Sequence, residues 1–235
     1  NTLVFYIWGD NGSSAEGLNG SVSELLAQNG LSSTVPQHIA ALNSLGGLEA
    51  LGGRKVDNMY HAGWAWAGNT PMRHTKLVAS HFGGTRNPLV VSWPRNIAPD
   101  RAPRPQFHHV NDVTPTILDL LKIPPPAIVD GYPQDPMDGV SMAYSFASAR
   151  EPGRKRVQYF ENNGSRGIYQ DGWYACTFGP LTPWQVSSPA QLVAWDSRRD
   201  VWELYNLTND FSQANNLAAQ EPGRLEAMKR LFLEV

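Results

Sequence analysis

Two continuous apolar runs, residues 3–8 and 88–94, end in a polar loop or at prolines. Runs of this length without alternation are typical of strands that a parallel sheet buries on both faces. Three helices are expected, at residues 21–28, 36–45 and 112–121, and the last of them has an apolar stripe at helical spacing. Strands and helices in this order predict an α/β fold. Residues 12–53, rich in Gly, Ser and Asn, are expected to form an insertion or lid between core strands.

The starts of the predicted helices carry their own signals. Ser21 and Glu24 have the spacing of a capping box, and Pro36 fits the first turn of the second helix. In the third helix, Thr114 is the expected cap and Pro115 the expected first residue.

From about residue 157 the pattern changes to short strands separated by turn residues. The expected strands are residues 157–160, 166–169, 173–178 and 192–195. The segments Asn162-Asn163-Gly164 and Gln170-Asp171-Gly172 are typical of hairpin turns, and a last helix is expected from about Pro222. We therefore predict an α/β part at residues 1–150 and a small subdomain of antiparallel strands with a terminal helix at residues 151–235.

The first apolar run leads into a carboxylate and a carboxamide, Asp10 and Asn11. In an open α/β sheet, ligands gather outside the carboxyl ends of the strands. Two oxygen-bearing side chains at such a place suit a hard cation such as Ca²⁺ or Mg²⁺. The same residues followed by Gly12 also form ordinary turns after buried strands. Asp10 and Asn11 are therefore candidate metal ligands, with a simple turn as the alternative.

Lys76 is a candidate anion-binding residue. It precedes Gly83 and Gly84, and adjacent glycines let the backbone turn tightly and approach a ligand closely. An ammonium group on such a loop suits a tetrahedral oxyanion. Arg73 and His74 lie close by in the sequence. The alternative is a solvated surface lysine.

Histidines and aromatic residues widen the set of candidates. His61 and His81 are candidates for contacting a substrate. The adjacent residues His108 and His109 project to different sides of a strand or helix, which favours a structural, hydrogen-bonded role over a metal pair. An aromatic cluster could wall a pocket for an aromatic ligand or serve as packing; its members are Tyr60, Trp64 and Trp66.

Composition limits the kinds of partner. With 41% hydrophobic and 17% charged residues, the 235-residue chain is globular in type. A formal net charge of -2 gives no broad attraction to nucleic acid or anionic membranes. No run reaches the roughly twenty apolar residues of a membrane span. Cys176 is the single cysteine, which excludes an internal disulfide and a zinc site built on several thiolates.

Several motifs occur in the order in which sulfatases carry them. Asp10-Asn11-Gly12 follows the first strand, and Lys76 and the segment 83–86 come later. The remaining motifs are Gly63-Trp64-Ala65, Asn69-Thr70-Pro71, Val91-Ser92-Trp93-Pro94 and residues 106–118, 202–210 and 215–218. Over nearly its whole length the chain resembles the sulfatases, and among them the bacterial-type arylsulfatases.

This resemblance implies an alkaline-phosphatase-like α/β fold with a carboxyl-terminal subdomain of antiparallel strands and a helix, in an enzyme that cleaves small-molecule sulfate monoesters. Composition argues against nucleic acid or membrane as a partner. The resemblance implies a divalent cation, usually calcium with magnesium as an alternative, that Asp10 and Asn11 help to bind. Lys76 matches the lysine that contacts the sulfate group. Arg73 is the fallback, because Phe82 stands where many sulfatases have Glu and the spacing from Lys76 is stretched.

The resemblance also implies a nucleophile that these residues do not supply. Sulfatases use a formylglycine made from a Cys, sometimes a Ser, within a Cys-x-Pro-x-Arg motif in their amino-terminal half. Cys176 lacks the Pro and the Arg and is expected to be a small buried strand residue. The chain is therefore expected to be the carboxyl-terminal portion of an enzyme, inactive alone, with formylglycine upstream. The alternatives are a phosphonate or phosphate ester hydrolase of the same superfamily and a non-catalytic fragment.

Overall fold

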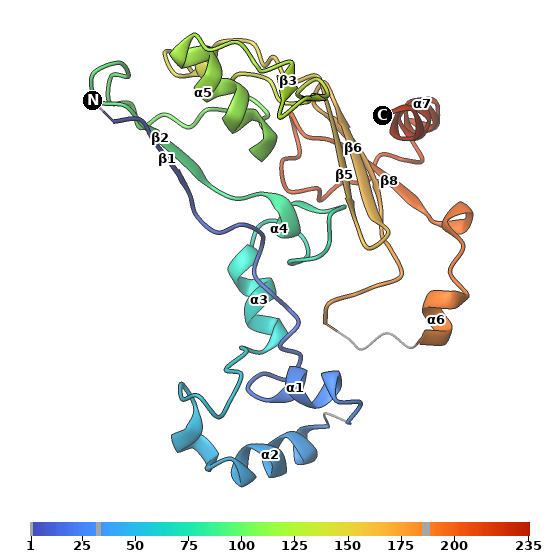
Figure 1. Cartoon of the computed structure of the whole chain (residues 1–235). Helices are drawn as coiled ribbons and strands as arrows, with labels where there is room; N and C mark the ends of the chain where they lie inside the picture. The colour runs from blue at the N-terminus through green and yellow to red at the C-terminus, as the bar shows by residue number, and fades with distance from the viewer. Residues whose placement is uncertain (1, 32–33, 185–188) are drawn as a thin grey trace. The chain divides into compact units, whose positions relative to one another are not determined.

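The computed structural model describes residues 2–31, 34–184 and 189–235 of the chain (Figure 1). The chain contains two compact units. Unit 1 comprises Asn1–Tyr6, Leu89–Gln158 and Tyr169–Gly172, and unit 2 comprises Ile7–Pro88, Tyr159–Ile168 and Trp173–Val235. The boundary predicted at residue 150 stays a prediction, because each compact unit combines several separate segments of the chain and neither unit begins or ends there. No helix in the described ranges has the length and apolar character that crossing a membrane requires.

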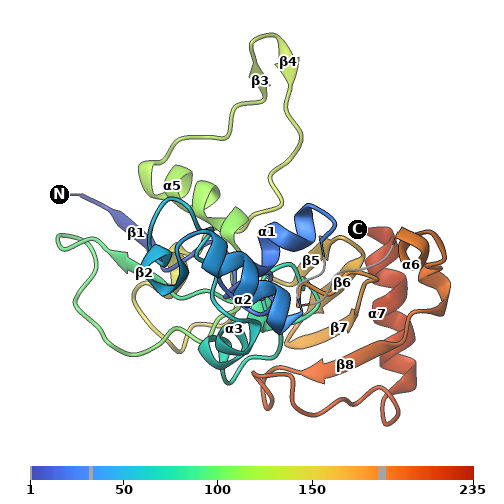
Figure 2. The same ribbon diagram turned by 90° about the horizontal axis from the view of Figure 1, so that it is seen from below.

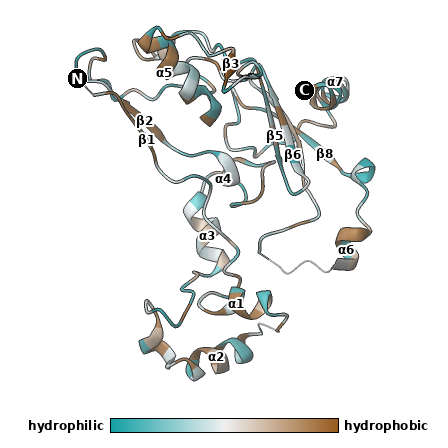
Figure 3. Ribbon diagram, in the orientation of Figure 1, coloured by the Kyte–Doolittle hydropathy of each residue, from teal (hydrophilic) through white to brown (hydrophobic). Residues whose placement is uncertain are grey.

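Both apolar runs form strands, as predicted. β1 (Val4–Ile7) and β2 (Leu89–Ser92) pair in a two-stranded sheet, and Figure 3 shows their apolar character. The expectation that these strands are buried is wrong, because Tyr6 is 54% and Val90 is 59% exposed. Among the described residues, each of the two strands pairs with the other alone. Apolar runs show which residues favour a strand, but they do not show which faces are covered.

The third predicted helix is α5 (Val113–Leu121), but it starts differently from the prediction. Asp112 stands at the cap position, so Thr114 and Pro115 lie inside the first turn instead of at the cap and the first position. A short 3₁₀ turn precedes the helix, and there Asp112 accepts a hydrogen bond from the N–H of His109 at 2.9 Å. This tight turn sets the start of α5.

A small hairpin follows α5 in the chain. It consists of β3 (Ile128–Val129) and β4 (Tyr132–Pro133), which pair antiparallel. Figure 2 shows the hairpin extending away from α5. Every residue of its two strands is exposed, so the hairpin adds little to the packing of unit 1.

The best-buried charges of unit 1 form an ion pair. Nζ of Lys155 lies 2.9 Å from Oδ1 of Asp112, and both side chains are buried. Burial raises the pKa of Asp112, but hydrogen bonds, that of His108 foremost, outweigh burial and lower it to about 2. His108 also lies 3.2 Å from the hydroxyl of Tyr144. It therefore has the structural, hydrogen-bonded role that the sequence favoured.

Replacing Lys155 by methionine is expected to lower the free energy of unfolding by about 3 kcal/mol, because the carboxylate of Asp112 would stay buried without its cation. Urea denaturation followed by tryptophan fluorescence measures the change. The matched control is Lys122→Met, which removes an exposed partner of Asp119 and should cost less than about 1 kcal/mol. Equal losses in the two variants would contradict the expectation.

The larger sheet has four strands in the order β5-β6-β7-β8 (Figures 1 and 2). Their bounds are β5 (Val157–Asn162), β6 (Ser165–Gln170), β7 (Trp173–Thr177) and β8 (Trp202–Asn206). The predicted hairpin turns are confirmed: Asn163 and Gly164, like Asp171 and Gly172, have positive φ angles. The predicted terminal helix is α7 (Pro222–Glu234).

The helix α7 packs on this sheet through an aromatic contact. Phe232 stacks on Tyr159 with ring centroids 4.6 Å apart and meets Trp202 edge-on at 5.4 Å. Met228, one turn earlier, is also buried. These residues lie on one face of α7, as its spacing of apolar positions requires.

One predicted strand is wrong. Residues 192–195 lie in and just after α6 (Pro189–Val193), and the fourth strand of the sheet is β8. A run of four apolar residues has no periodicity that separates a helix from a strand. Pairing with a neighbouring strand identifies the fourth strand: β8 lies antiparallel to β7, with Ala175 opposite Leu204.

The two early helices are confirmed as α1 (Ser23–Gln28) and α2 (Val35–Ser44), with Pro36 in the first turn of α2. They pack around a small core that contains Val22, Leu42 and Val56. The predicted capping box at Ser21 and Glu24 is wrong, because Val22 stands at the cap and no side chain caps the helix.

Ser21 cannot cap α1 because its backbone is used elsewhere. It has a φ of +48° and donates its N–H to the carbonyl of Met59 at 2.5 Å. The remaining helices are α3 (Ala62–Asn69), α4 (Phe82–Thr85) and the 3₁₀ turns η1 (Gly47–Ala50), η2 (Val110–Asp112), η3 (Ala143–Ser145) and η4 (Ser197–Arg199).

Candidate functional site

The loop that follows β1 lines a pocket of about 710 Å³ within unit 2. Asp10 and Asn11 belong to its wall, and so does Lys76, which comes much later in the chain. Asn11 donates its side-chain N–H to the carbonyl of Gly12 at 2.8 Å, so its Oδ1 is the oxygen left for a ligand. The structure therefore brings the candidate cation ligands and the candidate anion contact to one pocket.

Close backbone contact holds this loop in place. Gly12 donates its N–H to the carbonyl of Gly84 at 2.9 Å, and a Cβ at Gly12 would lie only 1.6 Å from the carbonyl oxygen of Gly83. A side chain at Gly12 would therefore push the loop away from α4. The amide of Asn87 pairs with the N–H and the carbonyl of Asn11 at 3.1 Å each, in the orientation that satisfies both.

Lys76 is tied to the same loop by its backbone and its side chain. Its N–H donates to the carbonyl of Ser13 at 3.0 Å, and its Nζ donates to Oε2 of Glu16 at 2.6 Å. Asn69, at the end of α3, accepts from the N–H of Ser13 at 3.0 Å and donates to the carbonyl of His74 at 2.9 Å. These bonds fix the strand-end loop and the loop of Lys76 against each other.

Charged groups of both signs lie at the pocket, and Glu16, which is not among the described wall residues, pairs with Lys76. The hydrogen bond to Glu16 raises the pKa of Lys76, and the charge of Asp10 adds to this effect. Burial raises the pKa of Glu16, but the hydrogen bonds from Lys76 and Ser14 outweigh it and lower the pKa overall. The guanidinium of Arg86 also lines the pocket, so its wall carries two cationic side chains, Lys76 and Arg86, beside the carboxylate of Asp10. An added cation would make the pocket more favourable for a bound anion.

Asp10 and Asn11 suit a hard divalent cation by donor type, since a carboxylate and an amide oxygen are the ligands that calcium and magnesium prefer. Neither presents sulfur or imidazole. Calcium takes six to eight oxygens, so these two side chains would supply a minority of the ligands, with the rest from water, substrate or other protein groups.

Arg73 and His81 are not brought to the pocket. Arg73 donates to the hydroxyl of Tyr205 at 2.8 Å and to the carbonyl of Gln213 at 3.0 Å. His81 is buried and lies 3.1 Å from Oε2 of Glu203. Neither is among the described residues that line the pocket. Their proposed contact with a substrate stays a prediction from the sequence, and the structure shows both in internal hydrogen bonds.

The aromatic candidates separate in the same way. Tyr60 lines the pocket, and its hydroxyl accepts the N–H of Ser14 at 3.0 Å. Trp66 meets the ring of His74 edge-on at 5.1 Å and therefore serves as packing. The Nδ1 of His61 accepts the N–H of Gly63 at 2.9 Å, which is the role of a helix cap.

The sequence assigned no role to Arg86, which lines the pocket, or to Glu16, which is not among the described wall residues but binds Lys76. The carboxylate of Glu16 binds Lys76 across 60 positions of sequence, a contact that no local pattern shows. The sequence could have indicated Glu16 by its place in the same loop as Asp10, because it is another side chain there that carries oxygen atoms.

A pH effect on stability is expected from His74. Burial, followed by the charges of His81 and Arg73, lowers the pKa of His74 to about 3, and its Nδ1 has no hydrogen-bond partner in the described part of the chain. The unfolded chain takes up a proton at this residue below about pH 6.5 and the folded chain does not, so stability falls as the pH falls. Between pH 7 and 5 the loss should be about 1–2 kcal/mol.

Denaturant unfolding at several pH values measures this slope. His74→Asn is expected to flatten it, and asparagine tolerates the positive φ of +66° at this position. His61→Asn, at an exposed residue, is the matched control and should leave the slope as it is. An unchanged slope in His74→Asn would contradict the assignment to this residue.

Comparison with known proteins places these motifs in one family. A family model described as Sulfatase matches residues 1–123. An uncharacterized sulfatase of Schizosaccharomyces pombe is 29% identical over 237 residues, which cover 99% of this chain and 37% of that protein. The chain thus spans little more than a third of the length of this curated relative.

A solved structure from Bacteroides thetaiotaomicron, described with the metabolism of multiple glycosaminoglycans, has a TM-score of 0.51 to this chain at 22% sequence identity. The match covers 74% of this chain and 34% of that one. It shows the alkaline-phosphatase-like α/β fold that the motifs implied. Because the family model matches more than half of its residues, the chain belongs to the sulfatase family.

Proposed function

We propose that the protein is a sulfuric ester hydrolase of the arylsulfatase type, and that the pocket beside β1 is part of its active site. The observation that carries the proposal is the placement of Asp10, Asn11 and Lys76 on one pocket wall. Membership of the sulfatase family supports sulfate esters as the substrate class.

In this proposal Lys76 binds the sulfate group. An ammonium has three donors, so Lys76 can keep its bond to Glu16 and still donate to a sulfate oxygen. Glu16 then acts as a positioning residue: it holds the ammonium charged and aimed by a bond of 2.6 Å. Charge that develops on the sulfate oxygens and on the leaving oxygen is stabilised by this preorganised donor.

Asp10 and Asn11 are proposed to hold a divalent cation, Ca²⁺ or Mg²⁺, which when bound supplies Lewis-acid chemistry at the sulfate oxygens. The attacking hydroxyl is proposed to come from a formylglycine outside these 235 residues. Cys176 does not provide it, because this thiol is completely buried and is not among the described residues that line the pocket.

The apolar part of the pocket wall supports an aromatic leaving group. Trp8, Tyr60 and Met72 line it together with the polar residues. Flat rings pack well against aromatic and thioether side chains. We therefore propose small aryl sulfates as test substrates.

The test compares nitrophenyl sulfate with nitrophenyl phosphate and a phenylphosphonate ester in the full-length protein. We expect kcat/KM for the sulfate to exceed the other two by at least about tenfold, a difference of about 1.4 kcal/mol in transition-state binding. A preference for phosphate or phosphonate would assign the protein to the other hydrolase class of the superfamily.

The 235-residue chain is expected to show no turnover by itself, and only weak affinity for Ca²⁺, because its pocket offers few of the oxygens that this cation takes. Calorimetric titration with Ca²⁺ and an assay with nitrophenyl sulfate check this beside the full-length protein. Turnover by the chain alone would place the nucleophile among its own residues and overturn the proposed arrangement.

A further inference from the structure

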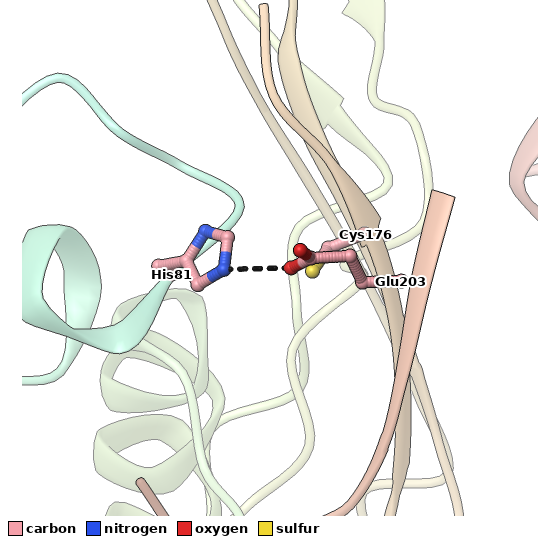
Figure 4. A group of neighbouring side chains, drawn as sticks. All are labelled: His81, Cys176 and Glu203. Atoms are coloured by element: carbon pink, nitrogen blue, oxygen red, sulfur yellow. Dashed lines mark hydrogen bonds and ion pairs between the residues drawn. The ribbon is translucent and has the colours of Figure 1, made fainter. Parts of the chain in front are cut away.

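Three side chains with metal-binding atoms meet in the interior of unit 2, away from the pocket wall. They are His81, Cys176 and Glu203, and one donor atom of each lies within 4.8 Å of the other two. Figure 4 shows the imidazole and the carboxylate facing each other, with the sulfur beside the carboxylate. His81 and Cys176 are buried, and the side chain of Glu203 is 29% exposed.

The strand register explains why two of the three meet. Cys176 on β7 and Glu203 on β8 are directly opposite each other in the antiparallel pair. Opposite residues of such a pair project from the same face with their Cβ atoms close together. His81 immediately precedes α4. The first residue of that helix, Phe82, donates its backbone N–H to Oε1 of Gln213 at 2.8 Å. Rigid elements therefore fix all three positions.

We propose that His81, Cys176 and Glu203 bind a transition-metal ion of the Zn²⁺ type at a site distinct from the proposed sulfate pocket. Imidazole, thiolate and carboxylate are the three ligand types that zinc accepts, and zinc sites often keep one further position for water. Thiolate and imidazole ligands disfavour calcium and magnesium. None of the three residues lines the pocket of Asp10 and Lys76, as far as the described residues define its wall.

Neighbouring groups can orient two of the proposed ligands. Nδ1 of His81 lies 2.9 Å from Oγ of Ser80, which can accept a hydrogen bond from an Nδ1–H group, and in that tautomer Nε2 has a lone pair for the ion. The hydroxyl of Tyr205 donates to Oε2 of Glu203 at 2.6 Å. Within the described ranges, the hydrogen bonds to this carboxylate go to Oε2, so Oε1 keeps its lone pairs.

The sulfur is also held in place. Nε2 of Gln213 donates to Sγ of Cys176 at 3.8 Å, and Gln213 is completely buried. Burial raises the pKa of the Cys176 thiol well above its ordinary value, and the charge of Arg73 acts in the opposite direction. Without an ion the residue is therefore a thiol, and a bound cation is needed to make it a thiolate.

The proton balance of binding is simple and involves no oxidation or reduction. The thiol proton of Cys176 leaves to solvent as the metal–sulfur bond forms. His81 changes tautomer: the proton on Nε2, which is hydrogen-bonded to Glu203, is replaced by a proton on Nδ1, beside Ser80. The partly exposed side of Glu203 gives the ion a way in. Affinity should therefore fall as the pH is lowered.

Titration of the 235-residue chain and of the full-length protein with Co²⁺ tests this site. A thiolate bound to Co²⁺ gives an intense near-ultraviolet charge-transfer band, and in the 235-residue chain Cys176 is the single cysteine. That chain therefore assigns the band without ambiguity. We expect the band to appear, to vanish when Zn²⁺ displaces Co²⁺, and to persist in excess Ca²⁺.

Variants then test the three ligands separately. Cys176→Ser should abolish the band, and Glu203→Gln and His81→Asn should each weaken Co²⁺ binding by about tenfold or more. Glu226→Gln, an exposed carboxylate on α7, is the matched control and should bind Co²⁺ like the wild type. Circular dichroism checks that each variant is folded.

Two results would overturn the site. The first is a folded wild-type chain that gives no charge-transfer band with Co²⁺. The second is a band whose strength and midpoint are the same in wild type, Glu203→Gln and His81→Asn, because Cys176 would then bind the ion without these partners. Either result leaves the sulfatase proposal standing, since that proposal depends on Asp10, Asn11 and Lys76.

Discussion

Asp10→Ala in the full-length protein is expected to lower kcat/KM for nitrophenyl sulfate by about a thousandfold or more. The change removes the one carboxylate among the two candidate cation ligands, and a bound cation contributes several kcal/mol to transition-state stabilisation in such sites. At about 1.4 kcal/mol per factor of ten, this loss amounts to three orders of magnitude. Affinity for Ca²⁺, measured by calorimetry, should fall in parallel.

Asp10→Asn keeps an oxygen and loses the charge, so its kcat/KM should lie between that of Asp10→Ala and the wild type. Asp135→Ala removes an exposed carboxylate of unit 1 and serves as the matched control. Wild-type turnover in Asp10→Ala would remove Asp10 from the site, and with it the proposed cation.

Lys76→Ala is expected to lower kcat by about 10²–10³-fold, the cost of removing one preorganised donor from a developing oxyanion. Lys55→Ala, at an exposed lysine of the same unit, is the control and should leave kcat unchanged. A kcat in Lys76→Ala that equals that of Lys55→Ala would show that the ammonium does not contact the reacting group.

Glu16→Gln distinguishes positioning from contact. The hydrogen bond to Glu16 raises the pKa of Lys76, so its loss should shift the basic limb of the pH–rate profile of kcat to lower pH. A purely structural role of Glu16 would change stability and leave that limb in place. The profile therefore separates a residue that acts through Lys76 from one that merely packs beside it.

Local patterns in the sequence were sufficient for most of the elements. β1 and β2 follow from continuous apolar runs, and α5 and α7 follow from apolar positions at helical spacing. The prediction failed where a contact between distant segments determines which element forms. Residues 192–195 could form either element, and pairing with β7 made residues 202–206 the fourth strand.

The candidate site shows the same division. Asp10, Asn11 and Lys76 were found because strand-end loops and glycine-rich turns have recognisable residue types, and they do share a pocket. Glu16 was missed because its partner lies 60 positions away. His81 was a candidate for contacting a substrate, and that contact stays a prediction. The structure shows its side chain buried beside Glu203, and no sequence pattern gives the direction of a side chain in a loop.

The hydrogen bonds that join residues 13–21 to residues 59–69 have a consequence for how this protein can diversify. Ser13 bonds Asn69, Leu18 accepts the N–H of Ala62, and Ser21 bonds Met59, so the segment between them begins and ends at fixed neighbouring points. The entropy of closing a loop depends only weakly on its length. The segment between Ser21 and Met59, which contains α1 and α2, could therefore be lengthened, shortened or exchanged while Asp10 and Lys76 keep their spacing. We expect insertions and replacements in related chains to concentrate in this segment.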